Sequence, residues 1–418
     1  MISESSGLTF FYLINGILLG ILNFKIFQKI NQKTLFSFFD LNILWFTFFF
    51  YAPFFWILNR TFLKQKYFDF SFYTLSFSYS TIYLFLSLIL IIFFPSNNPP
   101  QETKNKVLKV KGISLFFLIF SVTLNFLLET PLAEFILTGS SDFARLVQED
   151  LHSENINAQI LSRELCAGLA WIPLVYFVYE KKLLSKLLLF LSSLCLSAFY
   201  FSKTGLMLPF LVLFFYYLPI FKKIKTILIV SAGIISLFIG TFFLVNYDNL
   251  DRIPIFNKIG ERIISETGWA PLHFNIVKES NPPHFYGSRY FFGLNTLFGI
   301  RKKVNYSRDA MLEERGTDTG TTSGFAGVPL YAFFGQFWYL AFPIIICIIY
   351  FIDSNIKNYF STTNGKKIFY LFLSCSLINT FTVDVFRVFS PLFLIVPNLV
   401  FKTLLGLFVL KNIEKRYE

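Results

Sequence analysis

The chain has 418 residues, of which 55% are hydrophobic and only 15% are charged, and it carries a formal net charge of +12. Soluble domains carry about 25% charged residues. This composition argues against a soluble enzyme and predicts an integral membrane protein.

Apolar runs close to the roughly 20 residues that a helix needs to cross a bilayer recur along the chain. Backbone amides in lipid must be paired within the segment, so each run is expected to be helical. We therefore predict an all-α polytopic membrane protein with about 11 transmembrane helices, at 7–27, 35–58, 68–94, 110–130, 162–179, 183–200, 204–220, 226–246, 325–352, 367–386 and 389–410. The predicted organisation is a bundle over 1–246 with a small outer loop at 131–161, a large loop over 247–324, and a second bundle with a tail over 325–418.

Lysine and arginine counts in the connections predict the orientation, because basic residues concentrate on the cytoplasmic side. With eleven spans, one side holds 20 basic and six acidic residues, whereas the other holds 17 basic and 19 acidic ones. This asymmetry places the C-terminus in the cytoplasm and the N-terminus outside. The basic balance is thus a topology signal and does not indicate nucleic-acid binding. The expected location is the cytoplasmic (inner) membrane of a bacterium.

The 247–324 loop is the one long polar segment, and it holds ten of the 37 basic residues and two of the three histidines. Its last part, 316–324, is rich in glycine and hydroxyl residues and directly precedes a span. Thr321 and Thr322 could therefore help to form an anion site at a helix start, where backbone N–H groups are free. The alternative is a flexible linker with an ordinary N-cap.

Cations in other outer connections extend the candidate site. Arg145 lies in a stretch of 131–161 whose apolar spacing predicts an amphipathic surface helix. Lys203 and Arg387 each stand at the outer end of a span, where a cation either snorkels to the interface or holds a phosphate across a cavity. For Arg387, an ion pair with Asp384 is the competing interpretation.

Familiar catalytic motifs are absent from the sequence: there is no Walker loop, no HExxH, no CxxC and no GxSxG. The four cysteines fall within predicted spans and are interpreted as small apolar residues. The few acidic residues within spans lie near span ends, whereas ion-coupled carriers usually keep ionisable groups at the midplane. These features favour an extracytoplasmic enzyme over a carrier.

Two segments resemble the O-antigen polymerase (Wzy-type) family of oligosaccharide repeat unit polymerases. The run His284-Phe-Tyr-Gly-Ser-Arg-Tyr-Phe-Phe-Gly-Leu is similar to a segment of that family's large outer loop. The run from Thr321 to Gly335 resembles its pattern at the start of a late span. The general plan also matches over most of the chain: ten to fourteen spans, one dominant outer loop in the second half, and an arginine near the last pair of spans. The repeated arginine motifs of some members are not clear here, which leaves the identity of the catalytic arginines open.

The resemblance implies a metal-independent, GT-C-like membrane glycosyltransferase that acts outside the cytoplasmic membrane. Its substrates would be oligosaccharide repeat units on undecaprenyl diphosphate, polymerised into O-antigen or capsule-type polysaccharide, and its partners a chain-length regulator and a flippase. A diphosphate leaving group without a metal needs arginines, which bind phosphate oxygens through a planar fork, and the acceptor hydroxyl needs a base or an orienting group. The candidates for catalysis are His284, Arg289, Arg387 and His273, with Asp318 and Glu266 as acidic alternatives for the base; those for substrate binding are Arg145, Arg252, Arg308, Arg315, Thr321, Thr322 and Lys203.

Three other functions remain open at this point. An O-antigen ligase would need the same diphosphate site and a long outer loop. A flippase or exporter of lipid-linked oligosaccharide would need a cationic cavity along many spans, and these spans hold almost no basic residue away from their ends. A scaffolding protein would not need arginines dispersed through an outer loop.

Overall fold

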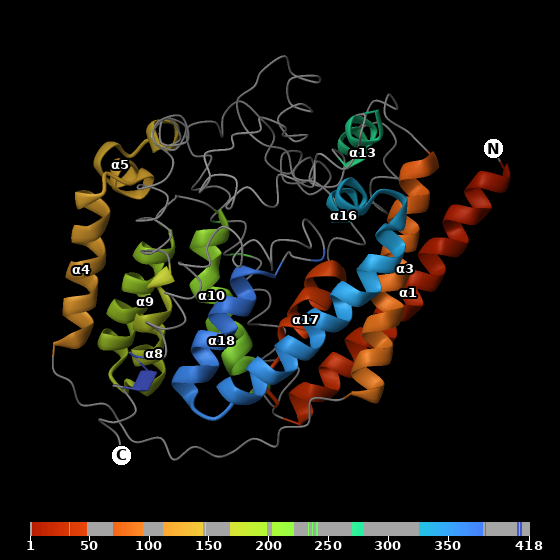
Figure 1. Ribbon diagram of the computed structural model, residues 1–418. Helices are drawn as coiled ribbons and strands as arrows, with labels where there is room; N and C mark the ends of the chain where they lie inside the picture. The colour runs from red at the N-terminus through yellow and green to blue at the C-terminus, as the bar shows by residue number, and fades with distance from the viewer. Residues whose placement is uncertain are drawn as a thin grey trace.

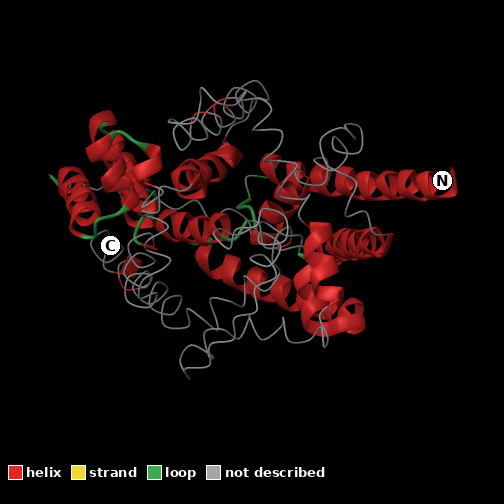
Figure 2. Ribbon diagram, turned by 90° about the horizontal axis from the view of Figure 1, so that it is seen from above, coloured by secondary structure: helices red, strands yellow, loops and turns green. Residues whose placement is uncertain are grey.

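The structure is a computed structural model, and it describes 2–32, 34–47, 70–94, 112–144, 168–198, 203–220, 270–279 and 326–378, together with the single positions 147, 233, 236, 240, 381, 408, 410 and 411. In these residues all regular secondary structure is helical (Figures 1 and 2). This agrees with the all-α membrane protein that the sequence predicts.

Twelve labelled α-helices or short 3-10 turns follow the first helix along the described chain. A further helical segment covers residues 38–47, and we call it the 38–47 helix. The bounds are α1 Ile2–Asn31, α3 Phe70–Phe93, α4 Ile113–Leu127, α5 Pro131–Thr138, α8 Trp171–Tyr179, α9 Leu183–Ser197, α10 Lys203–Tyr217, η2 Leu218–Ile220, α13 Ala270–Glu279, α16 Gly327–Phe334, η5 Gly335–Phe337, α17 Trp338–Phe360 and α18 Asn364–Ser376.

Most long helices lie side by side in a row that does not follow the chain order (Figure 1). From one edge of the row, α4 packs on α9, which packs on α8 and α10, and both of these contact α18. Helix α18 then contacts α17, α17 contacts α3, and α3 contacts α1. Helices α17 and α18 therefore join the N-terminal helices to those of the middle of the chain, and a single buried apolar cluster runs through this assembly.

Helix α17 shows why this fold suits a bilayer. One face is buried through Phe342, Ile346 and Ile349, whereas the opposite face exposes Leu340 and Ile344, at 56% and 62%. A helix that is apolar all round is expected in a membrane or a large core. Among the described residues, Thr74–Phe93 and Gly335–Phe360 are long and apolar enough to cross a membrane, and the bent pair of α4 and α5 is a third candidate.

A sharp bend separates α4 from α5, whose axes differ by 93°. The residue Glu129 adopts a positive φ of 44° at the bend, and Thr130 caps the new helix by accepting a hydrogen bond from the Ala133 N–H. Proline at position 131 starts α5, as is common at the first helical residue. The predicted span over 110–130 is thus α4, and α5 turns across the end of the bundle beside α9 and α10 (Figure 1).

The predicted span over 325–352 differs from the structure. A separate short helix, α16, comes first, and the candidate span covers Gly335–Phe360 instead. The reason is Gly335, whose φ of +56° and ψ of −136° break the helical path before α17. The predicted span over 367–386 is also interrupted, because α18 ends at Ser376 in a turn at Leu377.

Several predictions on the fold extend beyond the described residues. Positions 226–246 and 389–410 are described at isolated residues only, so the count of eleven spans and the GT-C-like scaffold remain predictions. The described helices for 68–94 and 183–200 match their predicted spans closely. The described cysteines Cys195, Cys347 and Cys375 are free thiols within helices.

Candidate functional site

Most of the predicted polar site falls outside the described residues. This applies to Arg145, Arg252, His284, Arg289, Arg308, Arg315, Thr321, Thr322 and Arg387. Two predicted residues are placed. Lys203 is the first residue of α10, and His273 lies in the first half of α13.

His273 belongs to the buried face of α13. Its side chain is 0% exposed, as is Val277 one turn later, and Phe274 beside it is 4% exposed. Lys278 and Glu279, at the end of the same helix, are exposed. This alternation indicates a helix with one face packed into the protein. In this arrangement the His273 imidazole does not face solvent.

The partner of α13 is α16, which lies within the run from Thr321 to Gly335 that resembles the polymerase family. The Phe274 and Tyr331 rings lie 5.1 Å apart at 57°, within the range for favourable aromatic pairs. Figure 1 shows α13 beside α16 at the end of the bundle that also holds α5. Val328 and Leu330 of α16 are 0% exposed and belong to the main core. The 270–279 part of the large predicted loop is therefore packed on the membrane bundle.

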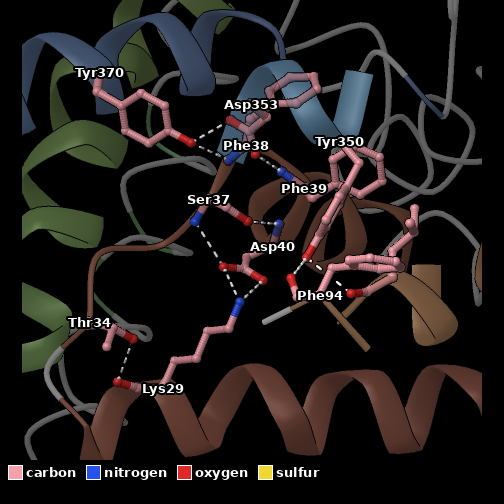
Figure 3. Close-up of polar contacts among 11 residues, drawn as sticks. Lys29, Thr34, Ser37, Phe38, Phe39, Asp40, Phe94, Tyr350, Asp353 and Tyr370 are labelled. Atoms are coloured by element: carbon pink, nitrogen blue, oxygen red, sulfur yellow. Dashed lines mark hydrogen bonds and ion pairs between the residues drawn. The ribbon is translucent and has the colours of Figure 1, made fainter. Parts of the chain in front are cut away.

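A buried charged cluster lies near the other end of α17 (Figure 3). It is built around the start of the 38–47 helix, where Ser37 and Asp40 form a reciprocal capping box. The Ser37 N–H donates to Asp40 Oδ2 at 2.8 Å, and the Asp40 N–H donates to Ser37 Oγ at 3.0 Å. Each side chain satisfies one N–H that has no acceptor within the helix.

The next two N–H groups of this helix are satisfied from distant parts of the chain. The Phe38 N–H donates to the Tyr370 hydroxyl at 2.8 Å, and the Phe39 N–H donates to Asp353 Oδ2 at 3.4 Å. The Tyr370 hydroxyl in turn donates to Asp353 Oδ1. Four consecutive N–H groups are thereby paired, which attaches the start of the 38–47 helix to α17 and α18.

Lysines balance the two buried carboxylates. The Lys29 ammonium lies 2.7 and 2.9 Å from the Asp40 oxygens, and Asp40 is 0% exposed. Lys357, which is 2% exposed, interacts electrostatically with Asp40 and Asp353. Both lysines lie in the last turn of their helices, where the helix dipole favours a cation, and the carboxylates lie at a helix start, where it favours an anion.

This cluster is suited to holding helices together and not to binding a substrate, because its described donors and acceptors are used by one another. Tyr350 extends the same pattern, since its hydroxyl lies 3.1 and 2.6 Å from the Leu90 and Phe94 carbonyl oxygens at the end of α3. In the sequence, Lys29, Lys357 and Asp353 are among the charges of the side that is predicted to be cytoplasmic. The Ser37-x-x-Asp40 spacing and the Asp353-x-x-x-Lys357 spacing are signals from which the cluster could have been suspected.

No group of three or more metal-ligating side chains occurs in the part of the chain that the structure describes. No protein-family model matches this sequence, and neither a curated protein nor a solved structure matches it. The function is therefore inferred from the residues of the chain itself.

Proposed function

We propose that this protein is a metal-independent glycosyltransferase that polymerises undecaprenyl-diphosphate-linked repeat units on the outer side of the bacterial cytoplasmic membrane. One observation carries the proposal: the polar segment 247–324, which holds the first family-like run and the start of the second, is the only long interruption of an otherwise apolar sequence. The packing of α13 on α16 supports it, because part of that segment is anchored to the bundle beside the second run.

The proposed reaction transfers the growing glycan from its lipid diphosphate to a hydroxyl of the next lipid-linked unit. The acceptor oxygen forms a bond to the anomeric carbon of the donor, and the bond from that carbon to the diphosphate oxygen breaks. His284 orients the acceptor hydroxyl and takes its proton. The products are a glycan longer by one repeat unit, which stays on the acceptor lipid, and free undecaprenyl diphosphate.

Arginine is the residue expected to stabilise the leaving group. Arg289 and Arg387 are proposed to bind the departing diphosphate through paired N–H groups, which match phosphate oxygens better than an ammonium does. A donor aimed at charge that develops in the transition state contributes on the order of 10²–10³ in rate. Arg145, Arg252, Arg308 and Arg315 are proposed to hold the lipid diphosphates in the same cavity.

Burial argues against one of the two histidine candidates. His273 faces the interior of the bundle at 0% exposure, which suits a role in holding α13 and does not suit contact with an acceptor sugar. His284 is therefore the preferred base in the proposal.

The decisive experiment deletes the gene and examines the surface polysaccharide on a gel. Loss of a polymerase leaves a single repeat unit on the lipid anchor. Loss of a ligase leaves no unit there, and loss of a flippase traps the units inside the cell. Only the first pattern agrees with the proposal.

Complementation with point variants then tests the site. Arg289→Lys and Arg387→Lys should fail to restore long chains at normal protein levels, and His284→Ala should shorten them. Lys278→Ala is the matched control, because Lys278 is an exposed cation of the same loop that is not assigned to the site. Full-length chains in the Arg387→Lys strain would contradict the proposed role of the guanidinium.

A further inference from the structure

The connection between α8 and α9 gathers positive charge at one end of the bundle. Lys181 and Lys182 are exposed in this connection, and Lys186 lies in the first turn of α9. Glu180 is the one acidic residue between 171 and 200, and its Oε1 accepts the Lys181 and Lys182 N–H groups at 2.8 and 3.0 Å. No described carboxylate forms an ion pair with the ammonium group of any of these three lysines.

The start of α9 adds to this positive charge. Lys182 occupies the N-cap position, and no side chain caps the helix there. The first turn of a helix leaves N–H groups without internal acceptors and carries a partial positive charge, which favours an anion and disfavours a cation. Three lysines around this helix start therefore repel both one another and the helix dipole, and an external anion would relieve that repulsion.

Contacts within the bundle hold two ammonium groups at this end without neutralising them. The Lys186 Nζ lies 5.3 Å from the centroid of the Phe177 ring in the last turn of α8, which is within the range of a cation–π contact. Lys366 begins α18 with its Nζ 4.9 Å from the Tyr359 ring and donates to Thr362 Oγ1 at 3.3 Å. Rings and hydroxyls carry no net charge, so both lysines remain available to an anion.

The connection between α17 and α18 lies beside the one between α8 and α9. The Gly365 N–H donates to the Tyr179 hydroxyl at 3.3 Å, and a Cβ atom at position 365 would come within 3.3 Å of Val175 Cγ1. Deeper in the bundle, the Trp171 and Phe369 rings lie 4.7 Å apart. Figure 1 shows both connections at the same end of the bundle. This agrees with the charge asymmetry, which places both of them on the cytoplasmic side.

An exposed apolar strip begins next to the three lysines. Leu183, Leu184 and Leu187 are 82%, 69% and 51% exposed, whereas Leu189 and Ser193 on the other face of α9 are 0% exposed. Leucines on this outer face suit contact with acyl chains, and long lysine stems let an ammonium group reach the headgroup level. The cationic end and the apolar strip thus match the two parts of an anionic phospholipid, whereas a free anion would use only the first.

We propose that Lys181, Lys182 and Lys186 bind the headgroup of an anionic phospholipid in the cytoplasmic leaflet, and that Leu183 and Leu184 contact its acyl chains. The lipid neutralises the repulsion at the start of α9 and anchors the α8–α9 connection at the membrane surface. Each lysine near an anionic surface contributes roughly fivefold to the binding constant. The site lies on the side opposite to the predicted position of 247–324, so it is separate from the proposed glycosyl transfer.

Native mass spectrometry of the full-length protein, purified in a neutral detergent, measures the binding. Phosphatidylglycerol is the anionic probe, and phosphatidylcholine is the zwitterionic one. The wild type should bind phosphatidylglycerol roughly tenfold or more tightly than phosphatidylcholine. Lys182→Gln should weaken phosphatidylglycerol binding about fivefold, and the combined variant with Lys181→Gln, Lys182→Gln and Lys186→Gln should weaken it on the order of 10².

Lys25→Gln is the matched control, because Lys25 lies near the end of α1, at the other edge of the row of helices. It should keep the phosphatidylglycerol affinity within about twofold, since salt screens charges that lie far from the lipid. Equal losses in Lys25→Gln and Lys182→Gln would overturn the site, because they would show a diffuse effect of net charge. Wild-type affinity in the combined variant would also overturn it. Melting temperatures check that every variant is folded.

A further comparison distinguishes a lipid from a free anion. Leu184→Ser leaves all the lysines in place, and it should weaken phosphatidylglycerol binding several-fold because it removes apolar contact with the acyl chains. Inorganic phosphate should not displace the lipid from the wild type. Displacement by inorganic phosphate, or wild-type lipid affinity in Leu184→Ser, would overturn the lipid site and leave an anion site that uses the lysines alone.

Discussion

Replacing Lys29 with methionine should destabilise the protein more than any nearby surface change, because it leaves the Asp40 carboxylate buried without its closest cation. The Lys29 ammonium lies 2.7 Å from Asp40 Oδ1, which corresponds to about 6 kcal/mol of attraction at an effective dielectric constant of about 20. Desolvation of the two ions offsets much of this attraction while the pair is intact. Breaking a buried pair typically costs about 3–5 kcal/mol.

Lys29→Met and Asp40→Asn should lower the free energy of unfolding by different amounts, because the two side chains differ in burial. Asp40 is 0% exposed and Lys29 is 18% exposed. An orphaned Lys29 can extend toward the interface, so Asp40→Asn should cost less than Lys29→Met. Asparagine also keeps an oxygen that can accept the Ser37 N–H. The double variant should cost less than the sum of the single ones, with a coupling energy of about 2 kcal/mol.

Thermal and denaturant unfolding in detergent, on the four proteins of this cycle, measures the coupling. Lys25→Met serves as the matched control, because Lys25 lies one turn earlier on α1 and forms no ion pair within the described residues. Additive effects of the two single variants would refute the reasoning. So would a Lys29→Met protein as stable as the Lys25→Met control.

Three further outcomes are expected. Gly335→Ala should lower the melting temperature in detergent. The φ of +56° and ψ of −136° at this position cost a residue with a side chain about 1–3 kcal/mol. An unchanged melting temperature would show that α16 and α17 join differently. Thr130→Val removes both the cap on the Ala133 N–H and the 2.8 Å hydrogen bond to Asn125 Oδ1. It should lower the free energy of unfolding by about 1–3 kcal/mol. A protease should also cut the α4–α5 bend faster in this variant. An alkaline phosphatase fused to the C-terminus should be inactive in cells, in line with the charge asymmetry, and an active fusion would reverse the topology and remove the outer assignment of 247–324.

The sequence by itself determined the class of protein and where its polar chemistry is concentrated. Apolar length and the scarcity of charge are local properties, so the sequence places the runs that form α3 and α9 within a few residues of their observed bounds. The polar interruption over 247–324 was equally visible. An apolar run long enough to cross the bilayer is expected to be helical, because a helix pairs all of its backbone polar groups within the segment.

Only the tertiary structure decided which residues act on one another. The residues around Asp40 and Asp353 do not indicate that both carboxylates accept N–H groups at the start of one helix. Phe39 and Asp353, which are joined by one of these hydrogen bonds, are 314 positions apart in the chain. The breaks at Gly335 and Leu377 were likewise hidden within apolar runs, because hydropathy does not report backbone dihedral angles. His273 lies in the predicted outer loop, but it is buried because Phe274 and Val277 of the same helix pack into the core. A linear pattern does not say which of many similar side chains will meet in a packed bundle. The hydrogen bonds of Tyr79 and Asn42 with the Phe381 backbone therefore become visible only when the three-dimensional arrangement is known.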